Sequence, residues 1–287
     1  MSAMQGVVRA RRMAGFGLVE LMIAMLLGLI VLGAAIAVFQ SNQRSYRANE
    51  GQNRVQESAR VAYEMMSRDL RSVGTSACTS EGMVLGQDAN SVAYRTPLTG
   101  SATQVTTRSA DDQSYRVESA TANSVTLVEV DGFTPSDAFE SGNVVMVCNG
   151  SMTGFAEVAS VSGQTVTFAD ALDFDPSNTE GAAPGSVSIA RFRNATWQLD
   201  GGALVVSRNG GANQQVATGL QSLALAYHQF SGGNPNAYVA SPTDFNYVDA
   251  ARVNFQIRAE AAREVDGSAT TITRNAATTV GLRSRIP

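Results

Sequence analysis

The stretch GFGLVELMIAMLLGLIVLGAAIAVF occupies Gly15 to Phe39 of this 287-residue chain. Between Phe16 and Phe39 it contains one charged residue, Glu20. As an α-helix it would be roughly 36 Å long, because each residue adds about 1.5 Å. A helix of that length can cross a hydrocarbon layer of about 30 Å. The pattern therefore predicts a membrane-spanning helix over residues 16–39.

The residues before this helix are basic. Arg9, Arg11 and Arg12 precede it without any acid, which favours a cytoplasmic N-terminus. A secretory signal would have a shorter apolar run and a small-residue cleavage site after it, and here SNQRSYR follows instead. An uncleaved anchor fits the length but does not explain Glu20, because a carboxylate in a membrane costs a few kcal/mol and marks a functional position.

The heptapeptide Gly15-Phe16-Gly17-Leu18-Val19-Glu20-Leu21 resembles the prepilin cleavage motif of type IV pilins and type II secretion pseudopilins. The resemblance implies that a membrane peptidase cuts after Gly15, that residues 1–15 are a leader, and that the same enzyme methylates Phe16. Glu20 then becomes the fifth residue of the mature chain. We expect this carboxylate to pair with the new amine of the same or a neighbouring subunit and so to fix the register of assembly, because an unpaired charge in an apolar bundle is strongly unfavourable.

A second helical pattern follows the apolar stretch. Apolar residues recur at steps of three and four, which places them on one helix face; they are Val55, Ala59, Ala62, Met66, Leu70 and Val73. Charged residues of alternating sign follow the same steps from Glu50 to Arg68. Gly74 is suited to end the helix. We therefore predict one helix from Phe16 to about Val73, with residues 40–74 as its amphipathic continuation.

Residues 75–287 change to a strand-like pattern. The predicted strands are Ser124–Val130, Asn143–Cys148, Phe155–Val161, Gln164–Ala169, Ser186–Phe192 and Ala251–Ala261. Hairpins are predicted at Ser162-Gly163 and at Asp200-Gly201-Gly202, the latter joining Ala195–Leu199 to Ala203–Ser207. The expected fold class is α+β: a long N-terminal helix packed on a mostly antiparallel β-rich head, with an inserted subdomain near residues 100–185.

The chain also resembles PilW-type minor pilins, with J-type pseudopilins of type II secretion as the close alternative. The similar segments are QNRVQESARVAYEMMSRDLRSVG after the apolar stretch, NVVMVCN, the GLQSL segment leading into Tyr227, and the strand beginning at Ala251-Arg252-Val253. The chain has no proline before Pro97, whereas many major pilins carry a helix-kinking one, and this suits a minor subunit.

The PilW-type resemblance implies a non-catalytic subunit that primes a type IV pilus and lies at or near its tip. The implied partners are the prepilin peptidase/methylase, other minor pilins, the major pilin, the inner-membrane assembly platform and, as an option, a tip adhesin. The implied location is the bacterial inner membrane with a periplasmic head, then the pilus at the cell surface. Twitching motility and cell adhesion are roles that such pili serve.

Composition limits other functions. The net charge is −4 and becomes more negative without the leader, so nucleic-acid binding is not expected, including at Arg191-Phe192-Arg193. All cations are arginine, which excludes lysine-based catalysis. Cys78 and Cys148 are the two cysteines, and export favours a disulfide over two buried thiols.

Few residues suggest chemistry. Asp170, Asp173 and Asp175 are weak calcium candidates, with a solvated acidic turn as the simpler interpretation. No other metal or cofactor is expected. His228 is the single histidine and no G-x-S-x-G elbow accompanies it, so catalysis is not expected. A membrane-anchored periplasmic binding or hydrolytic protein remains the alternative from another functional class.

Overall fold

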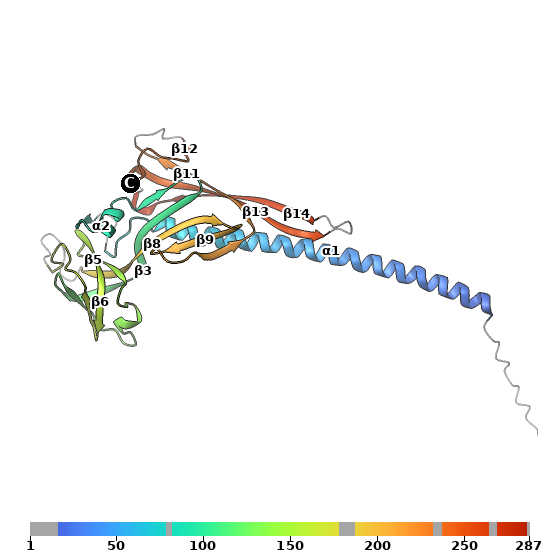
Figure 1. Ribbon diagram of the computed structural model, residues 1–287, viewed down its shortest axis with the longest axis horizontal. Helices are drawn as coiled ribbons and strands as arrows, with labels where there is room; N and C mark the ends of the chain where they lie inside the picture. Colours follow the sequence, from blue (N-terminus) through green and yellow to red (C-terminus); the bar gives the residue numbers. More distant parts are fainter. Residues whose placement is uncertain (1–16, 79–81, 178–186, 232–236, 264–268, 286–287) are drawn as a thin grey trace, which may run out of the picture. The chain divides into compact units, whose positions relative to one another are not determined.

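The structure is a computed structural model that describes residues 17–78, 82–177, 187–231, 237–263 and 269–285 (Figure 1). The chain divides into two compact units, one of Met1–Gly51 with Glu260–Thr270 and the other of Gln52–Ala259 with Thr271–Pro287. The long helix α1 (Leu18–Arg71) contributes to both. The predicted long helix is confirmed, with its last residue two positions before the predicted end.

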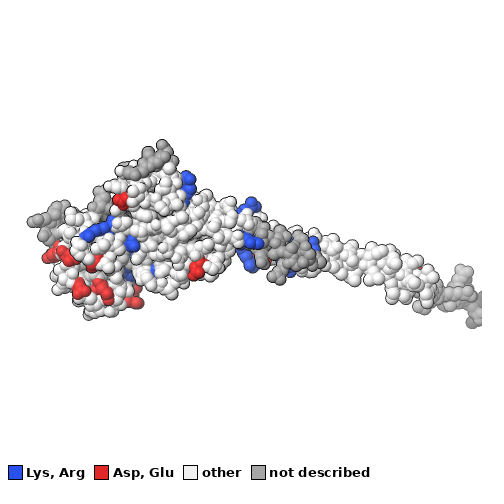
Figure 2. Space-filling view, turned by 45° about the horizontal axis from the view of Figure 1, so that its top comes forward, with Lys and Arg blue, Asp and Glu red and all other residues white. Residues whose placement is uncertain are grey.

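The first part of α1 is apolar on all sides, and its side chains are exposed. Leu18, Ile30 and Phe39 are among these exposed apolar residues. The helix is long and apolar enough to cross a membrane, with a mean hydropathy of 2.8 over its most apolar window. Figure 2 shows this part of α1 as a surface almost free of charged side chains.

The second unit is built from the last turns of α1 and from strands that are antiparallel except for β1, which pairs with β6 in parallel. In chain order its first elements are β1 (Met83–Val84), α2 (Ala89–Tyr94), β2 (Leu98–Gly100), β3 (Gln104–Ala120), β4 (Ser124–Leu127), η1 (Pro135–Asp137), β5 (Val144–Cys148), β6 (Met152–Ser162) and β7 (Thr165–Phe168). Then follow β8 (Ser188–Asp200), β9 (Ala203–Arg208), β10 (Gln214–Thr218), β11 (Leu220–Gln229), β12 (Tyr238–Val239), η2 (Phe245–Tyr247), β13 (Val248–Arg263), β14 (Ala269–Gly281) and η3 (Arg283–Arg285). The tips of β13 and β14 belong to the first unit.

Six strands close into a ring. β3 pairs with β8 and β4, β4 with β7, β7 with β6, β6 with β5, and β5 with β8, all antiparallel. Residues that alternate along these strands fill the interior, among them Val125, Val147, Val158, Val166 and Ile189. Most residues of this buried cluster lie between Val117 and Phe174, but Val187 and Ile189 also belong to it, so the inserted subdomain near residues 100–185 stays a prediction.

A second buried cluster lies beside α1. Beyond the ring, β8 continues to pair with β3 and also pairs with β9, and β9 pairs with the edge strand β10. A separate sheet has the order β12-β11-β13-β14. Both sheets and the last turns of α1 supply this cluster, in which Met66, Leu70, Trp197, Leu204 and Phe255 are buried. The predicted apolar face of α1 is therefore the face that packs.

Turn chemistry explains two connections. Gly201 and Gly202 have φ values of 55° and 79°, which the predicted β8–β9 hairpin requires. At the other hairpin Ser162 pairs with Thr165, so the turn residues are Gly163 and Gln164, one position later than predicted.

Several strands were not predicted. β3 and β14 are rich in threonine and other polar residues, so neither shows a clear apolar alternation. The separately predicted strands Ser186–Phe192 and Ala195–Leu199 are one strand, β8, because β3 continues its ladder through the polar residues Arg193 and Asn194. Ser186 lies outside the described residues.

Candidate functional site

Glu20 lies in the first turn of α1, where Leu21 donates a backbone hydrogen bond to Gly17 at 3.2 Å. Its neighbours Leu18, Val19, Leu21 and Met22 are all exposed apolar residues. Gly15 and Phe16, the predicted cleavage and methylation positions, lie outside the described residues. The described part of the site is thus one carboxylate on an apolar helix surface, which calls for a cationic partner once that surface is covered.

The last turns of α1 carry a buried polar network. Asp69 is 3% exposed and accepts a hydrogen bond from Nε1 of the single tryptophan, Trp197, at 2.9 Å. Its other oxygen lies 3.3 Å from the guanidinium of Arg193, whose side chain is 14% exposed. Burial raises the pKa of Asp69, while Arg193 and the Trp197 hydrogen bond oppose that rise.

A bulge extends this network to the surface. The β3–β8 register shifts between Ala110 and Ser114, at the position of Asp111 and Asp112. Arg193 approaches Asp111 at 3.5 Å and Asp112 at 3.3 Å, and Arg191 approaches Asp111 at 2.9 Å. Asp112 also meets Arg68 of α1 at 2.6 Å. These ion pairs fasten the end of α1 to β3 and β8.

The same pairs explain why Arg191-Phe192-Arg193 is not a free basic surface. Both arginines are matched by the bulge aspartates, and Phe192 is buried against Tyr94 and Phe155. Sequence reasoning did not find Asp69, Asp111 or Asp112, because a pairing across more than forty positions leaves no local signal. The polar run Asp111-Asp112-Gln113 within β3 is the feature that could have indicated a bulge.

The predicted disulfide is confirmed. Cys78, in the connection after α1, bonds to Cys148 at the end of β5, with a Cα–Cα distance of 6.0 Å. The bond spans 70 positions of sequence and links the α1 connection to a ring strand.

The three calcium candidates do not converge. Asp170, Asp173 and Asp175 are exposed, while Leu172 and Phe174 between them are buried. Asp175 accepts hydrogen bonds from the backbone and hydroxyl of Ser177, and these bonds lower the pKa of its carboxyl group. Within the described ranges no group of three or more His, Cys, Asp or Glu side chains could hold a metal ion.

His228 pairs with a carboxylate that sequence reasoning missed. Its Nδ1 lies 2.5 Å from Oδ1 of Asp249, and this contact joins β11 to β13. The Tyr238 ring lies 5.4 Å away, and Arg252 lies 3.9 Å above that ring. The group links three neighbouring strands, and the sequence alone does not reveal the register that brings it together.

The comparison with known families gives one match. The family model for a prokaryotic N-terminal methylation motif matches residues 10–36. No curated protein and no solved structure matches the chain. The chain therefore carries the type IV pilin and pseudopilin signal at its N-terminus, which indicates a pilin-like protein and fits processing by a prepilin peptidase and membrane anchoring. The families that carry this motif are structural, which is consistent with a protein that is not an enzyme.

Proposed function

We propose that this chain is a minor pilin that primes assembly of a type IV pilus and is incorporated at or near its tip. The observation that carries the proposal is the methylation motif at residues 10–36, which coincides with the start of a helix whose apolar side chains are exposed. The absence of proline before Pro97 and the PilW-type segments of the head support a minor subunit.

The proposed mechanism follows from the helix surface. In the membrane, lipid covers the apolar side chains of residues 18–39, and in the filament the helices of neighbouring subunits replace the lipid. This transfer has a small hydrophobic driving force, because lipid tails are as apolar as leucine. Glu20 supplies specificity instead, because its charge is satisfied only where an amine meets it. Phe16, whose amine cleavage would free, lies four positions before Glu20 in the sequence.

Mass spectrometry of the protein from its native host tests the processing step. The mature chain should begin at Phe16 and carry one methyl group on that residue's amine. A chain that still begins at Met1 would instead support an anchored periplasmic protein and contradict the proposal.

Deletion of the gene separates the two filament types. A minor pilin predicts that surface pili are lost and that protein secretion is unchanged. Loss of secretion with normal pili would assign the chain to a type II secretion pseudopilus. Complementation with the wild-type gene is the control.

A further inference from the structure

The strand β14 has an unpaired edge. It is the last strand in the order β12-β11-β13-β14, so β13 is its one neighbour among the strands that the structure describes. Such an edge presents free N–H and C=O groups that can pair with another chain. β14 is 13 residues long and contains no proline. The edge strand β10 of the larger sheet, by contrast, has 5 residues and an irregular register between Gln215 and Ala217.

Two contacts define how β14 pairs with β13. The Leu282 N–H donates to the Asp249 carbonyl at 2.8 Å, and Gln256 Nε2 donates to Asn275 Oδ1 at 3.4 Å. Both fit one antiparallel register, which places Ala276 opposite Phe255.

This register identifies the free backbone groups. In an antiparallel pair, alternate residues exchange hydrogen bonds with the neighbouring strand. Leu282, Val280, Thr278 and Ala276 therefore direct their backbone groups toward β13. The backbone groups of Asn275, Ala277 and Thr279 face the free edge, and the side chains of these three residues are exposed.

An apolar hollow of about 290 Å³ lies beside this edge. It is lined by Tyr63 of α1, Phe255 of β13 and residues 276–278 of β14. Residues of β13 and β14 line the hollow and no residue of β11 does, so the hollow lies toward β14 and away from β11. In a strand added to β14, side chains would alternate between the two faces of the sheet, as they do in β14. The side chain opposite Ala276 would therefore lie at this hollow.

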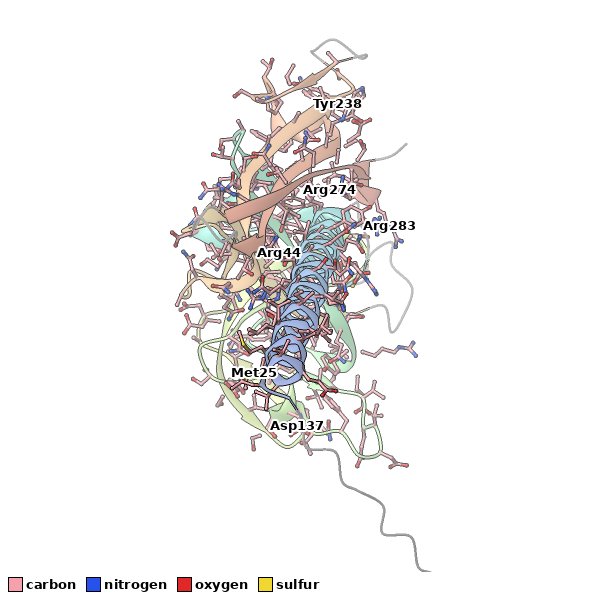
Figure 3. All side chains as sticks on the ribbon, turned by 90° about the vertical axis from the view of Figure 1, so that its right-hand side faces the viewer. Met25, Arg44, Asp137, Tyr238, Arg274 and Arg283 are labelled. Carbon is pink, nitrogen blue, oxygen red and sulfur yellow. A yellow bond between two sulfur atoms is a disulfide. The ribbon has the colours of Figure 1, made fainter. Side chains whose placement is uncertain are left out.

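Arg274 gives the edge a charge preference. This residue of β14 is labelled in Figure 3. It lies two residues from Ala276 and therefore on the same face, because side chains alternate along a strand. Its side chain is exposed, and it forms no ion pair within the part of the chain that the structure describes. An acidic residue on an added strand is favourable opposite Arg274, whereas a second copy of this chain would bring another arginine to the edge.

We propose that the β14 edge binds an extended segment of a different protein, in which an acidic residue lies two positions from an apolar residue. The acid pairs with Arg274, and the apolar side chain enters the hollow beside Tyr63 and Phe255. Backbone hydrogen bonds to Asn275, Ala277 and Thr279 hold the segment as an added strand. The inference does not depend on the pilus assignment.

Photo-crosslinking of the full-length chain in its native host tests the proposal. p-Benzoylphenylalanine replaces Thr279, whose side chain is exposed at the edge, and the same probe at Gln215 of β10 is the position control. We expect one crosslinked partner from Thr279, with the crosslink in a segment that carries an acid and an apolar residue two positions apart. The methylation state of Phe16 is measured in the same samples, so the two proposals are judged separately.

Variants of the edge sharpen the test. Ala277→Pro removes a free-edge N–H without breaking a β13–β14 hydrogen bond, and Ala277→Val keeps that N–H. Ala277→Pro should reduce the crosslink yield at least about tenfold, equivalent to about 1.4 kcal/mol, and Ala277→Val should retain it. Arg274→Glu should also reduce the yield, and an acid-to-arginine change in the partner segment should restore it. The Cys78–Cys148 disulfide, assayed by alkylation, verifies that each variant folds.

Four results would overturn the proposal. The first two are a crosslink to a second copy of this chain and the absence of any crosslink from Thr279. The third is a crosslink yield that stays unchanged in folded Ala277→Pro and Arg274→Glu variants. The fourth is a crosslinked segment that lacks the acid and apolar pair.

Discussion

Glu20 is the residue on which the proposed assembly specificity depends. Every other described residue from Gly17 to Phe39 is uncharged, so this carboxylate is the strongest polar feature of the apolar helix surface. We expect Glu20→Ala to be cleaved and methylated normally but to be lost from sheared filaments. Immunoblots of membrane and filament fractions measure this.

The control for that prediction is Glu57→Ala. Glu57 is an exposed acid on the same helix, beyond its apolar stretch, so filament incorporation should be unchanged. Incorporation of Glu20→Ala at the wild-type level would show that the carboxylate does not set the register.

Asp69 is the residue on which the buried network depends. Asp69→Ala leaves the Trp197 N–H without its acceptor and deprives Arg193 of one carboxylate, so we expect a loss of about 3 kcal/mol in the free energy of unfolding. Asp69→Asn can still accept from Trp197 and should lose less. Urea unfolding followed by the fluorescence of Trp197, the single tryptophan, measures both. Equal losses for the two variants would contradict this role.

The raised pKa of Asp69 predicts how the free energy of unfolding changes with pH in the wild type and in Asp69→Asn. An acid whose pKa is higher in the folded than in the unfolded state contributes stability below the unfolded value, here 3.8, and that contribution is lost as the pH rises through the folded pKa. The wild type should therefore lose free energy of unfolding relative to Asp69→Asn as the pH is raised from 3.8. If the difference in free energy of unfolding between the wild type and Asp69→Asn does not change with pH, burial does not dominate the pKa of Asp69.

At the scale of elements, the end of α1 is set by Gly74. This residue has a φ of 72°, and its N–H donates to the Arg108 carbonyl at 2.9 Å. A Cβ there would lie 3.0 Å from Ser284 Oγ and 3.3 Å from Pro97 Cγ. Gly74→Ala should therefore lower the free energy of unfolding by more than the roughly 1–2 kcal/mol that left-handed backbone strain alone produces.

Gly132→Ala is the matched control for Gly74→Ala. Gly132 has a φ of 78°, and no atom lies within 4 Å of the position that a Cβ would take. The loss of stability in this variant therefore reports left-handed backbone strain alone. Urea unfolding of both variants gives the difference. A loss at Gly74 no larger than that at Gly132 would show that Ser284 and Pro97 adjust without penalty.

Elements also differ in how far their sequences reveal them. The helix was predictable because its apolar residues repeat at three and four positions and Gly74 marks its end. Two strands were predictable from their own patterns, β5 from its continuous apolar run and β7 from its apolar alternation. β14 was not, because an edge strand buries little, and the face that carries the partly buried Ala276 also carries Arg274 and Thr278. The Asp69 and His228 pairs were missed because they depend on contacts between distant segments.

At the scale of the whole molecule, the disulfide joins the helix connection to the ring of strands. Cys148 is fully buried, and neither of the two cysteines is free. Since the bond closes a loop of 70 positions, the Cys78→Ser/Cys148→Ser variant should lose roughly 2–4 kcal/mol in the free energy of unfolding. Urea unfolding with and without reductant gives this difference, because reductant should destabilise the wild type and leave the variant unchanged.

Alkylation of the non-reduced mature protein tests the bond directly, and neither cysteine should be labelled. The single variant Cys78→Ser exposes the remaining thiol to the reagent only on unfolding, since Cys148 is buried. Labelling of both cysteines in the folded wild type would show that they are separate thiols. The packing of Met66, Leu70 and Trp197 in the shared core, rather than the crosslink, would then have to hold α1 against the strands.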